Sequence, residues 1–117
     1  MEETNKSCKL DTGMVSNEDK KLNDEIMHLG ICNYIHNELW IPKNREYGNS
    51  FSELYQKLGL ISAVTQITHK YNRLVKLATS DEEIIHESIE DTLLDLANYS
   101  IMTLMEIERE KTNKGIR

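Results

Sequence analysis

Turn-forming residues are scarce in this chain of 117 residues, and that scarcity constrains its fold more than any other feature. The sequence contains one proline and five glycines. Folds with many short strands need frequent turns, and those turns depend on glycine and proline. We therefore expect an all-α fold, a compact bundle of about four helices, and neither an all-β sandwich nor a doubly wound α/β fold.

Apolar residues recur at helical spacing in four segments. They predict helices over residues 18–40, 50–58, 60–78 and 81–110. Pro42 is expected to end the first helix, so residues 41–50 are predicted to form a loop. Gly59 suits the left-handed position that follows a helix. The prediction is one helical domain over residues 17–110, with a flexible tail over 1–16 and a frayed end over 111–117.

Both long predicted helices carry apolar stripes. The predicted core side of residues 60–78 consists of Ile61, Val64, Ile67 or Thr68, Tyr71, Leu74, Val75 and Ala78. That of residues 81–110 consists of Ile85, Ile89, Thr92, Leu93, Leu96 and Ser100. Nearly opposite that side, the last helix has a second face that begins acidic and becomes apolar at Met102 and Met105. A solvated face would stay polar along its length. We therefore expect a second packing partner, and a homo-oligomer would supply it.

Composition limits the classes of partner and the location. The net charge is −6 and the isoelectric point is about 5.2, which argues against direct nucleic-acid binding. No apolar run is long enough to span a membrane, and residues 1–10 lack the apolar segment of a signal peptide. Cys8 and Cys32 have no metal-binding or redox spacing. We expect a cytoplasmic protein.

Acidic side chains concentrate at the start of the last predicted helix. Seven acids and no lysine or arginine lie between residues 81 and 95. Glu87, Asp91 and Asp95 follow one another at one-turn spacing, and carboxylates crowded beside apolar neighbours favour a bound cation such as Mg²⁺. A solvated acidic face explains the same spacing, and from spacing alone it is the commoner arrangement.

Basic and aromatic residues elsewhere offer complementary chemistry. Lys70 and Arg73 lie in an acid-free segment and suit phosphate, although ordinary ion pairs between helices explain them equally well. In the predicted loop, Lys43 and Arg45 could close over a ligand. Tyr47 could stack on a base or serve the turn at Gly48.

Three segments, taken together, resemble the nucleotide modification associated domain family, which is grouped with the MazG-like all-α NTP pyrophosphatases and is frequent in bacteriophages. These segments are residues 43–51 (KNREYGNSF), 69–74 (HKYNRL) and 87–99 (ESIEDTLLDLANY). The resemblance covers about residues 20–108. It implies a helical, often dimeric protein in which acids bind Mg²⁺ and the metal engages the phosphates of a nucleotide.

The resemblance also implies roles for particular residues. Glu87 and Asp91 would be catalytic, and with Asp95 they would bind the metal. Lys70 and Arg73 would contact phosphate, and the nucleotide pocket would be lined by Tyr47, Asn49, Ser50, Phe51 and Asn98. Beyond what the resemblance implies, we also predict nucleotide or phosphate contacts from Lys43, Arg45 and His69.

One position departs from the family pattern and leaves the activity open. His69 stands where the family usually has an acid before the lysine that matches Lys70. MazG-like enzymes take acids from two helices, and residues 60–79 contain none. The sequence therefore predicts a nucleotide-binding protein that either hydrolyses a nucleoside phosphate with Mg²⁺ or, without catalysis, sequesters a nucleotide signal of host defence for a phage. The third hypothesis is that the chain is a structural helical partner that binds no small ligand.

Overall fold

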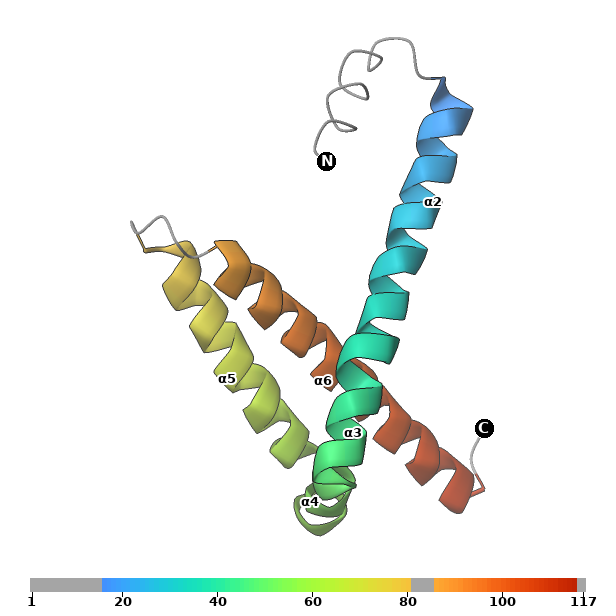
Figure 1. The fold of residues 1–117 in the computed structure, drawn as a ribbon. Coiled ribbons are helices and arrows are strands. Elements are labelled where there is room, and N and C mark those ends of the chain that lie inside the picture. Colours follow the sequence, from blue (N-terminus) through green and yellow to red (C-terminus); the bar gives the residue numbers. More distant parts are fainter. Residues whose placement is uncertain (1–15, 81–85, 116–117) are drawn as a thin grey trace. The chain divides into compact units, whose positions relative to one another are not determined.

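The computed structural model describes residues 16–80 and 86–115, except for the side chains of Tyr47, His86 and Glu87. Every element in these ranges is helical, so the all-α prediction is confirmed there (Figure 1). The helices are α2 (Asn17–Tyr34), the π-helix η2 (Ile35–Trp40), α3 (Ile41–Tyr47), α4 (Ser50–Leu58), α5 (Leu60–Ala78) and α6 (His86–Asn113).

The chain divides into two units, residues 1–34 and residues 35–117. In the described part of the first unit, α2 begins at a serine cap: the backbone N–H of Asp19 donates to Ser16 Oγ at 3.0 Å. Glu18 and Asp19 then place negative charge in the first turn, which the helix dipole favours. No side chain of α2 is buried. A helix of 18 residues with no buried side chain derives little stability from packing.

The predicted loop over residues 41–50 is wrong, because the second unit continues as helix through this stretch. The π-helix η2 leads directly into α3, and Pro42 lies in the first turn of α3. A first-turn residue needs no backbone N–H, so proline is tolerated there. Within residues 41–50, the chain turns at Gly48 and Asn49. Gly48 has a φ of +67°, and its N–H donates to the carbonyl of Asn44 at 2.8 Å.

The next two helices begin and end as predicted. α4 covers Ser50–Leu58 and α5 covers Leu60–Ala78, with Gly59 between them. Gly59 has a φ of +82°, in the left-handed range, and its N–H donates to the carbonyl of Tyr55 at 2.6 Å. Glycine adopts this φ without steric cost, so it can end one helix and precede the next.

The last helix, α6, contains 28 residues and is about 42 Å long. It ends at Asn113, three residues beyond the predicted end at residue 110. The predicted start at residues 81–85 lies outside the described residues. Within the described ranges, neither α6 nor any other helix combines the length and apolarity needed to cross a membrane.

The second unit is built around the contact between α5 and α6, which lie side by side (Figure 1). Much of what it buries is small or polar. The buried residues among those described are Ile35, Tyr55, Ser62, Ala63, Thr92, Asn98, Thr103 and Glu106. The threonines bond to their own helix: Thr92 Oγ1 donates to the Ser88 carbonyl and Thr103 Oγ1 to the Tyr99 carbonyl, both at 2.7 Å.

The predicted core stripes are wrong at several positions. Ile61 is 63% exposed, Tyr71 57% and Leu93 47%, and Val64, Val75 and Ser100 are exposed as well. The same predicted stripes are right at Ile67 and Leu74 on α5, which are half-buried, and at Thr92 on α6, which is buried. The inner side of α5 also carries the half-buried residues Lys70 and Leu77. Each of these two helices has two apolar stripes, and periodicity alone does not say which one faces the partner helix.

Candidate binding pocket

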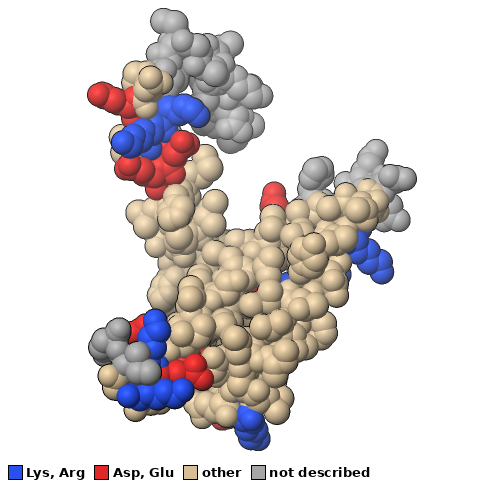
Figure 2. Space-filling model, turned by 180° about the vertical axis from the view of Figure 1, so that it is seen from behind, with Lys and Arg blue, Asp and Glu red and all other residues tan. Residues whose placement is uncertain are grey.

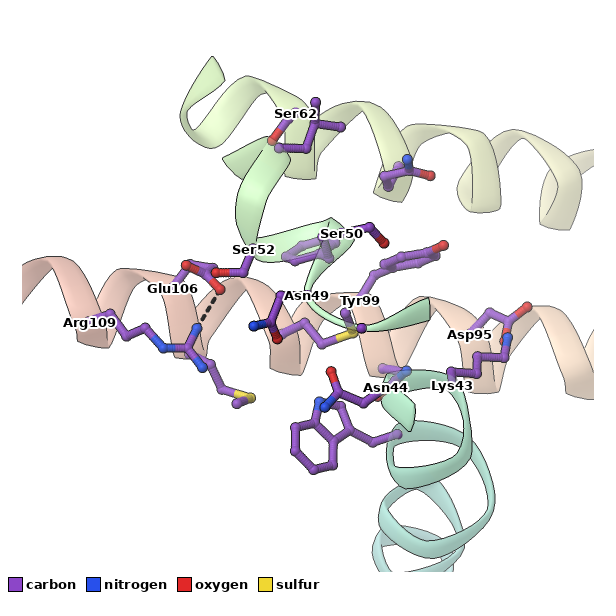
Figure 3. Close-up of a pocket in the computed structure, with 18 residues that line it drawn as sticks. Lys43, Asn44, Asn49, Ser50, Ser52, Ser62, Asp95, Tyr99, Glu106 and Arg109 are labelled. Atoms are coloured by element: carbon purple, nitrogen blue, oxygen red, sulfur yellow. Dashed lines mark hydrogen bonds and ion pairs between the residues drawn. The ribbon is translucent and has the colours of Figure 1, made fainter. Parts of the chain in front are cut away.

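The second unit contains an open pocket with a volume of about 470 Å³, within the range of small-molecule sites (Figure 3). Its wall comes from η2, α3, α4, α5, α6 and the turn at Gly48. The lining residues are Trp40, Lys43, Asn44, Gly48, Asn49, Ser50, Phe51, Ser52, Leu54, Ser62, Gln66, Asp95, Asn98, Tyr99, Met102, Met105, Glu106 and Arg109.

One face of α6 runs along the whole pocket. Its contributions follow at intervals of three or four residues, the spacing that keeps side chains on one side of a helix. They begin at Asp95 and end at Arg109, with Asn98, Met102 and Met105 between them. Figure 3 shows Asp95 beside Lys43 at one end of this face and Glu106 beside Arg109 at the other. The pocket therefore has two charged ends and a less polar middle.

Aromatic rings line the middle of the pocket. The rings of Phe51 and Tyr99 stack with centroids 5.8 Å apart and an interplanar angle of 27°. Trp40 contributes a third ring and stacks on His36 with centroids 5.9 Å apart. With Met102 beside them, these groups present polarisable apolar surface to the cavity. Such a surface suits a flat, unsaturated ring.

Two lysines share one carboxylate at the first end. Asp95 Oδ2 lies 3.1 Å from Lys70 Nζ, and Asp95 Oδ1 lies 3.5 Å from Lys43 Nζ. Lys70 comes from α5 and makes one of the interhelical ion pairs that the sequence left open as an alternative. Two positive groups against one negative group leave this end with a surplus of one positive charge. That surplus favours an anionic ligand group.

The other end holds a pair of opposite charges. Arg109 Nη1 forms an ion pair with Glu106 Oε2, which is buried, while the arginine side chain is half exposed. Nearby, the Tyr55 hydroxyl donates to Glu110 Oε1 at 3.2 Å. The pKa of Tyr55 is raised, first by burial, then by the negative charge of Glu110 and the hydrogen bond to it, and finally by Glu106.

Asn98 has a buried side-chain oxygen without a hydrogen-bond partner among the described residues. It exposes 6% of its surface, and its Oδ1 atom makes no hydrogen bond. A buried amide oxygen without a donor is costly, so most such groups in folded proteins are satisfied.

The structure brings six of the predicted site residues together around the pocket: Lys43, Asn49, Ser50, Phe51, Asp95 and Asn98. Lys70 is not part of the lining but contacts Asp95. Arg45, His69, Arg73 and Asp91 are exposed and do not line the pocket. The predicted roles of Tyr47 and Glu87 fall on side chains outside the described residues.

The described side chains include only two of the three predicted magnesium ligands, Asp91 and Asp95, because the side chain of Glu87 lies outside them. Both oxygens of Asp95 face lysines, and Asp91 is exposed. Among the residues that the structure describes, no three His, Cys, Asp or Glu side chains are grouped as a metal site would need. The magnesium site that combines Asp91 and Asp95 with Glu87 therefore stays a prediction.

The sequence reading missed several lining residues, and Arg109 is the one it could have found. Arg109 continues the face of Asn98, Met102 and Met105 by one further turn, so extending that face would have included it. Tyr99, which was also missed, directly follows Asn98 in the segment 87–99 that carries the family resemblance. Trp40, Ser62 and Gln66 lie on other helices, and only the packing of α3, α4 and α5 brings them to the pocket.

A pocket between helices with aromatic rings and charged ends has the features of a small-molecule site. Comparison with known families makes the assignment narrower. The family described as nucleotide modification associated domain 1 matches residues 43–107, and the chain belongs to this family. The match contains all three quoted segments and begins in α3, not near residue 20 as expected. No curated protein and no solved structure matches the chain.

Proposed function

We propose that the chain is a nucleotide-binding protein and that the pocket of the second unit binds the nucleotide. The observation that carries this proposal is one cavity in which the Phe51–Tyr99 ring pair lies next to a lysine-rich end. A nucleotide needs both features, because its base is a flat ring and its phosphates are anionic. The family description, which refers to nucleotides, supports the same conclusion.

In this proposal the phosphates lie at the end formed by Lys43 and Lys70. These two lysines share a single carboxylate, whereas Arg109 is neutralised by its own partner Glu106. A phosphate can therefore accept hydrogen bonds from Lys43 and Lys70 if it replaces Asp95 in some of its contacts with these lysines. The base then lies against the aromatic middle of the pocket.

Binding without turnover is the version that the described side chains support. A MazG-like pyrophosphatase needs carboxylates free to bind Mg²⁺, and Asp95 is engaged by two lysines while Asp91 is outside the lining. In a phage, such a protein would sequester a nucleotide signal of host defence. Hydrolysis with Mg²⁺ bound by Glu87 and Asp91 is the competing version, and the experiment below separates the two.

We also propose that the chain works as a homo-oligomer. Outward-facing apolar residues of the second unit include Ile61 on α5 and Leu104 on α6, which are 63% and 65% exposed. Figure 2 shows a face on which wide areas carry no Lys, Arg, Asp or Glu. Exposed apolar area of this kind is typical of a surface that another chain covers.

A thermal-shift screen followed by mass analysis tests the function. The protein is melted with a panel of nucleoside mono-, di- and triphosphates and cyclic nucleotides, once with Mg²⁺ and once with EDTA. We expect at least one nucleotide to raise Tm in EDTA, and the ligand to be recovered intact. Recovery of a cleaved product only with Mg²⁺, and its loss in Asp91→Asn, would establish the hydrolytic version instead.

Two tyrosine variants locate the binding. Tyr99→Ala removes a ring of the pocket, whereas Tyr34→Ala removes an exposed ring of α2. We expect Tyr99→Ala to lose the nucleotide-induced rise in Tm and Tyr34→Ala to keep it. Equal shifts in both variants would place the nucleotide elsewhere, and no shift with any nucleotide in the wild type would contradict the proposal.

A further inference from the structure

Glu106 and Arg109 form an ion pair at the end of the pocket opposite the lysines (Figure 3). Both residues line the cavity. The Glu106 side chain is 5% exposed, and that of Arg109 is 50% exposed. A glutamate is seldom buried to this degree, and here the partner that compensates its charge stays accessible. The pocket wall therefore holds a buried hydrogen-bond acceptor and an accessible donor side by side.

The ion pair adjoins a second carboxylate. The Tyr55 hydroxyl donates to Glu110 Oε1 at 3.2 Å, and Glu110 lies one turn beyond Glu106 on α6. Burial raises the pKa of Tyr55 most, and the charges of Glu110 and Glu106 raise it further, so both carboxylates lie near this phenol. Two carboxylates thus accompany one arginine, whereas two lysines share one carboxylate at the opposite end. One end of the pocket favours anionic groups, and the other favours N–H and O–H donors.

The two ends are far apart along α6. Asp95 and Glu106 are eleven residues apart in the sequence, which corresponds to about 16 Å along a helix. A ligand that reaches both ends is therefore elongated, with an anionic group at one end and hydrogen-bond donors at the other. A nucleotide whose phosphates lie at the lysine end meets this description, because its base then extends along the aromatic middle of the pocket toward the ion pair.

The chemistry of the ion pair distinguishes among the bases. A carboxylate only accepts hydrogen bonds, and a guanidinium only donates them. Guanine has two adjacent donors, N1–H and the 2-amino group, and its acceptor O6 lies beside them. Adenine and cytosine offer one amino group next to a ring nitrogen that repels a carboxylate, and uracil offers one N–H between two carbonyl oxygens. Guanine is therefore the base whose edge best complements Glu106 beside Arg109, and arginine is a common partner of guanine O6.

We propose that the Glu106–Arg109 pair recognises the base and that the ligand is a guanine nucleotide. This inference rests on the proposed function. Glu106 accepts hydrogen bonds from N1–H and the 2-amino group, and Arg109 donates to O6. A base that lacks one of these donors leaves a buried carboxylate poorly satisfied, so it binds more weakly.

Calorimetry in EDTA with a series of bases tests the inference without any variant. The wild type is titrated with GTP, ITP, ATP, CTP and UTP, or with the matching series of the phosphate form that raises Tm most. ITP differs from GTP only in lacking the 2-amino group, so this comparison isolates one donor. We expect GTP to bind most tightly and ITP to bind at least about fivefold more weakly. A smaller difference between the two, or tighter binding of another base, would overturn the inference.

A matched pair of variants connects the preference to Glu106. Glu106→Gln keeps the size of the side chain but removes its charge and one of its two acceptor oxygens. Glu90→Gln makes the same change at an exposed position of α6 that does not line the pocket. Each variant is titrated with GTP and ITP and is melted without nucleotide.

The ratio of the GTP and ITP affinities separates recognition from a structural role. We expect Glu106→Gln to weaken GTP binding by about tenfold or more and to bring the two affinities within a factor of about two, whereas Glu90→Gln keeps the wild-type ratio. An ion pair that only stabilises the helix would lower Tm in Glu106→Gln and weaken GTP and ITP binding equally. That outcome would overturn the role of Glu106.

Failure of this inference differs from failure of the proposed function. If no nucleotide of the melting screen binds the wild type, the proposed function is wrong. If nucleotides bind without a preference for guanine, the proposed function stands and only the recognition of the base by Glu106 and Arg109 is wrong.

Discussion

At the scale of single residues, Asp95 determines how the cationic end of the pocket behaves. Its two oxygens face Lys70 Nζ at 3.1 Å and Lys43 Nζ at 3.5 Å. The side chain is 23% exposed, so these contacts are partly screened by water. If the lysines receive the phosphates of a nucleotide, Asp95 competes with those phosphates. If Asp95 binds a metal, the carboxylate instead helps to hold the phosphates through that metal.

Replacing Asp95 distinguishes these two roles. In Asp95→Asn the lysines lose their competing charge, so we expect metal-free nucleotide binding to strengthen by about two- to fivefold, consistent with partly exposed ion pairs worth about 0.2–1 kcal/mol. Calorimetry in EDTA measures the change. Loss of binding in this variant would show that the carboxylate itself serves the ligand or its metal.

Tyr55 makes stability depend on pH in the alkaline range. Burial and the neighbouring Glu110 raise its pKa above the ordinary value, which is about 10. Because the folded state holds the phenol proton more tightly than the unfolded state, this contribution to stability is complete below pH 10 or so and is lost as the pH rises through the folded pKa.

A Tyr55→Phe variant isolates that effect from the titration of lysines, which both proteins share. At pH 8 we expect urea denaturation to give the wild type a free energy of unfolding about 1 kcal/mol larger, owing to the hydrogen bond to Glu110. The difference should shrink as the pH passes 10 and continue to shrink above it. A difference that stays constant to pH 11.5 would contradict the raised pKa.

At the scale of helices, the sequence predicted the elements whose ends have a local chemical cause. The bounds of α4 and α5 follow from Gly59, whose backbone conformation ends one helix and starts the next. The segment from residue 41 to 47 was missed because Pro42 was taken as the end of a helix, although proline is equally compatible with the first turn of a new one.

Gly59 should therefore be sensitive to a methyl group, although the space around it is open. Its φ of +82° strains any side chain, whereas Gly30 lies within α2 and an added Cβ meets no atom within 4 Å. We expect Gly59→Ala to lower the free energy of unfolding by about 1–2 kcal/mol. Gly30→Ala should not lower it, since alanine favours helix. Equal effects in denaturant titrations would contradict the role of Gly59.

At the scale of the whole molecule, the described residues expose two kinds of surface that a partner would cover. All of α2 is exposed, and the second unit leaves apolar residues on the outer sides of α5 and α6. The sequence predicted a second packing face on the last helix, but it also placed Leu93 on the core side, where the structure leaves it exposed. In the structure, Asn98, Met102 and Met105 line the pocket. Leu93 and Leu104 form an exposed outer stripe of α6.

A single charge on that outer stripe tests self-association. Leu104 is 65% exposed, so Leu104→Lys should leave the helix intact while it disfavours contact with a second copy. We expect sedimentation analysis to show an oligomer for the wild type and dissociation for this variant. Thr112→Lys, which adds the same charge at an exposed position of α6, should behave as the wild type. A monomeric wild type would contradict the proposal.

The candidate site shows where reading the sequence reaches its limit. Residues close together in sequence, such as Lys43, Asn49, Ser50 and Phe51, were predicted as one group and do line the pocket. Contacts across helices were not predicted, because helical periodicity leaves the rotation of each helix about its axis undetermined. The pairing of Lys43 with Asp95 and the approach of Trp40 depend on that rotation.

The central claim, that this pocket binds a nucleotide, has a direct optical test. Trp40 is the chain's one tryptophan, and it lines the pocket. A nucleotide that enters must change the surroundings of this indole, so titration in EDTA should change its fluorescence with a saturable curve that Tyr99→Ala abolishes or weakens. Unchanged fluorescence throughout a titration with a nucleotide that calorimetry shows to be bound would contradict the claim.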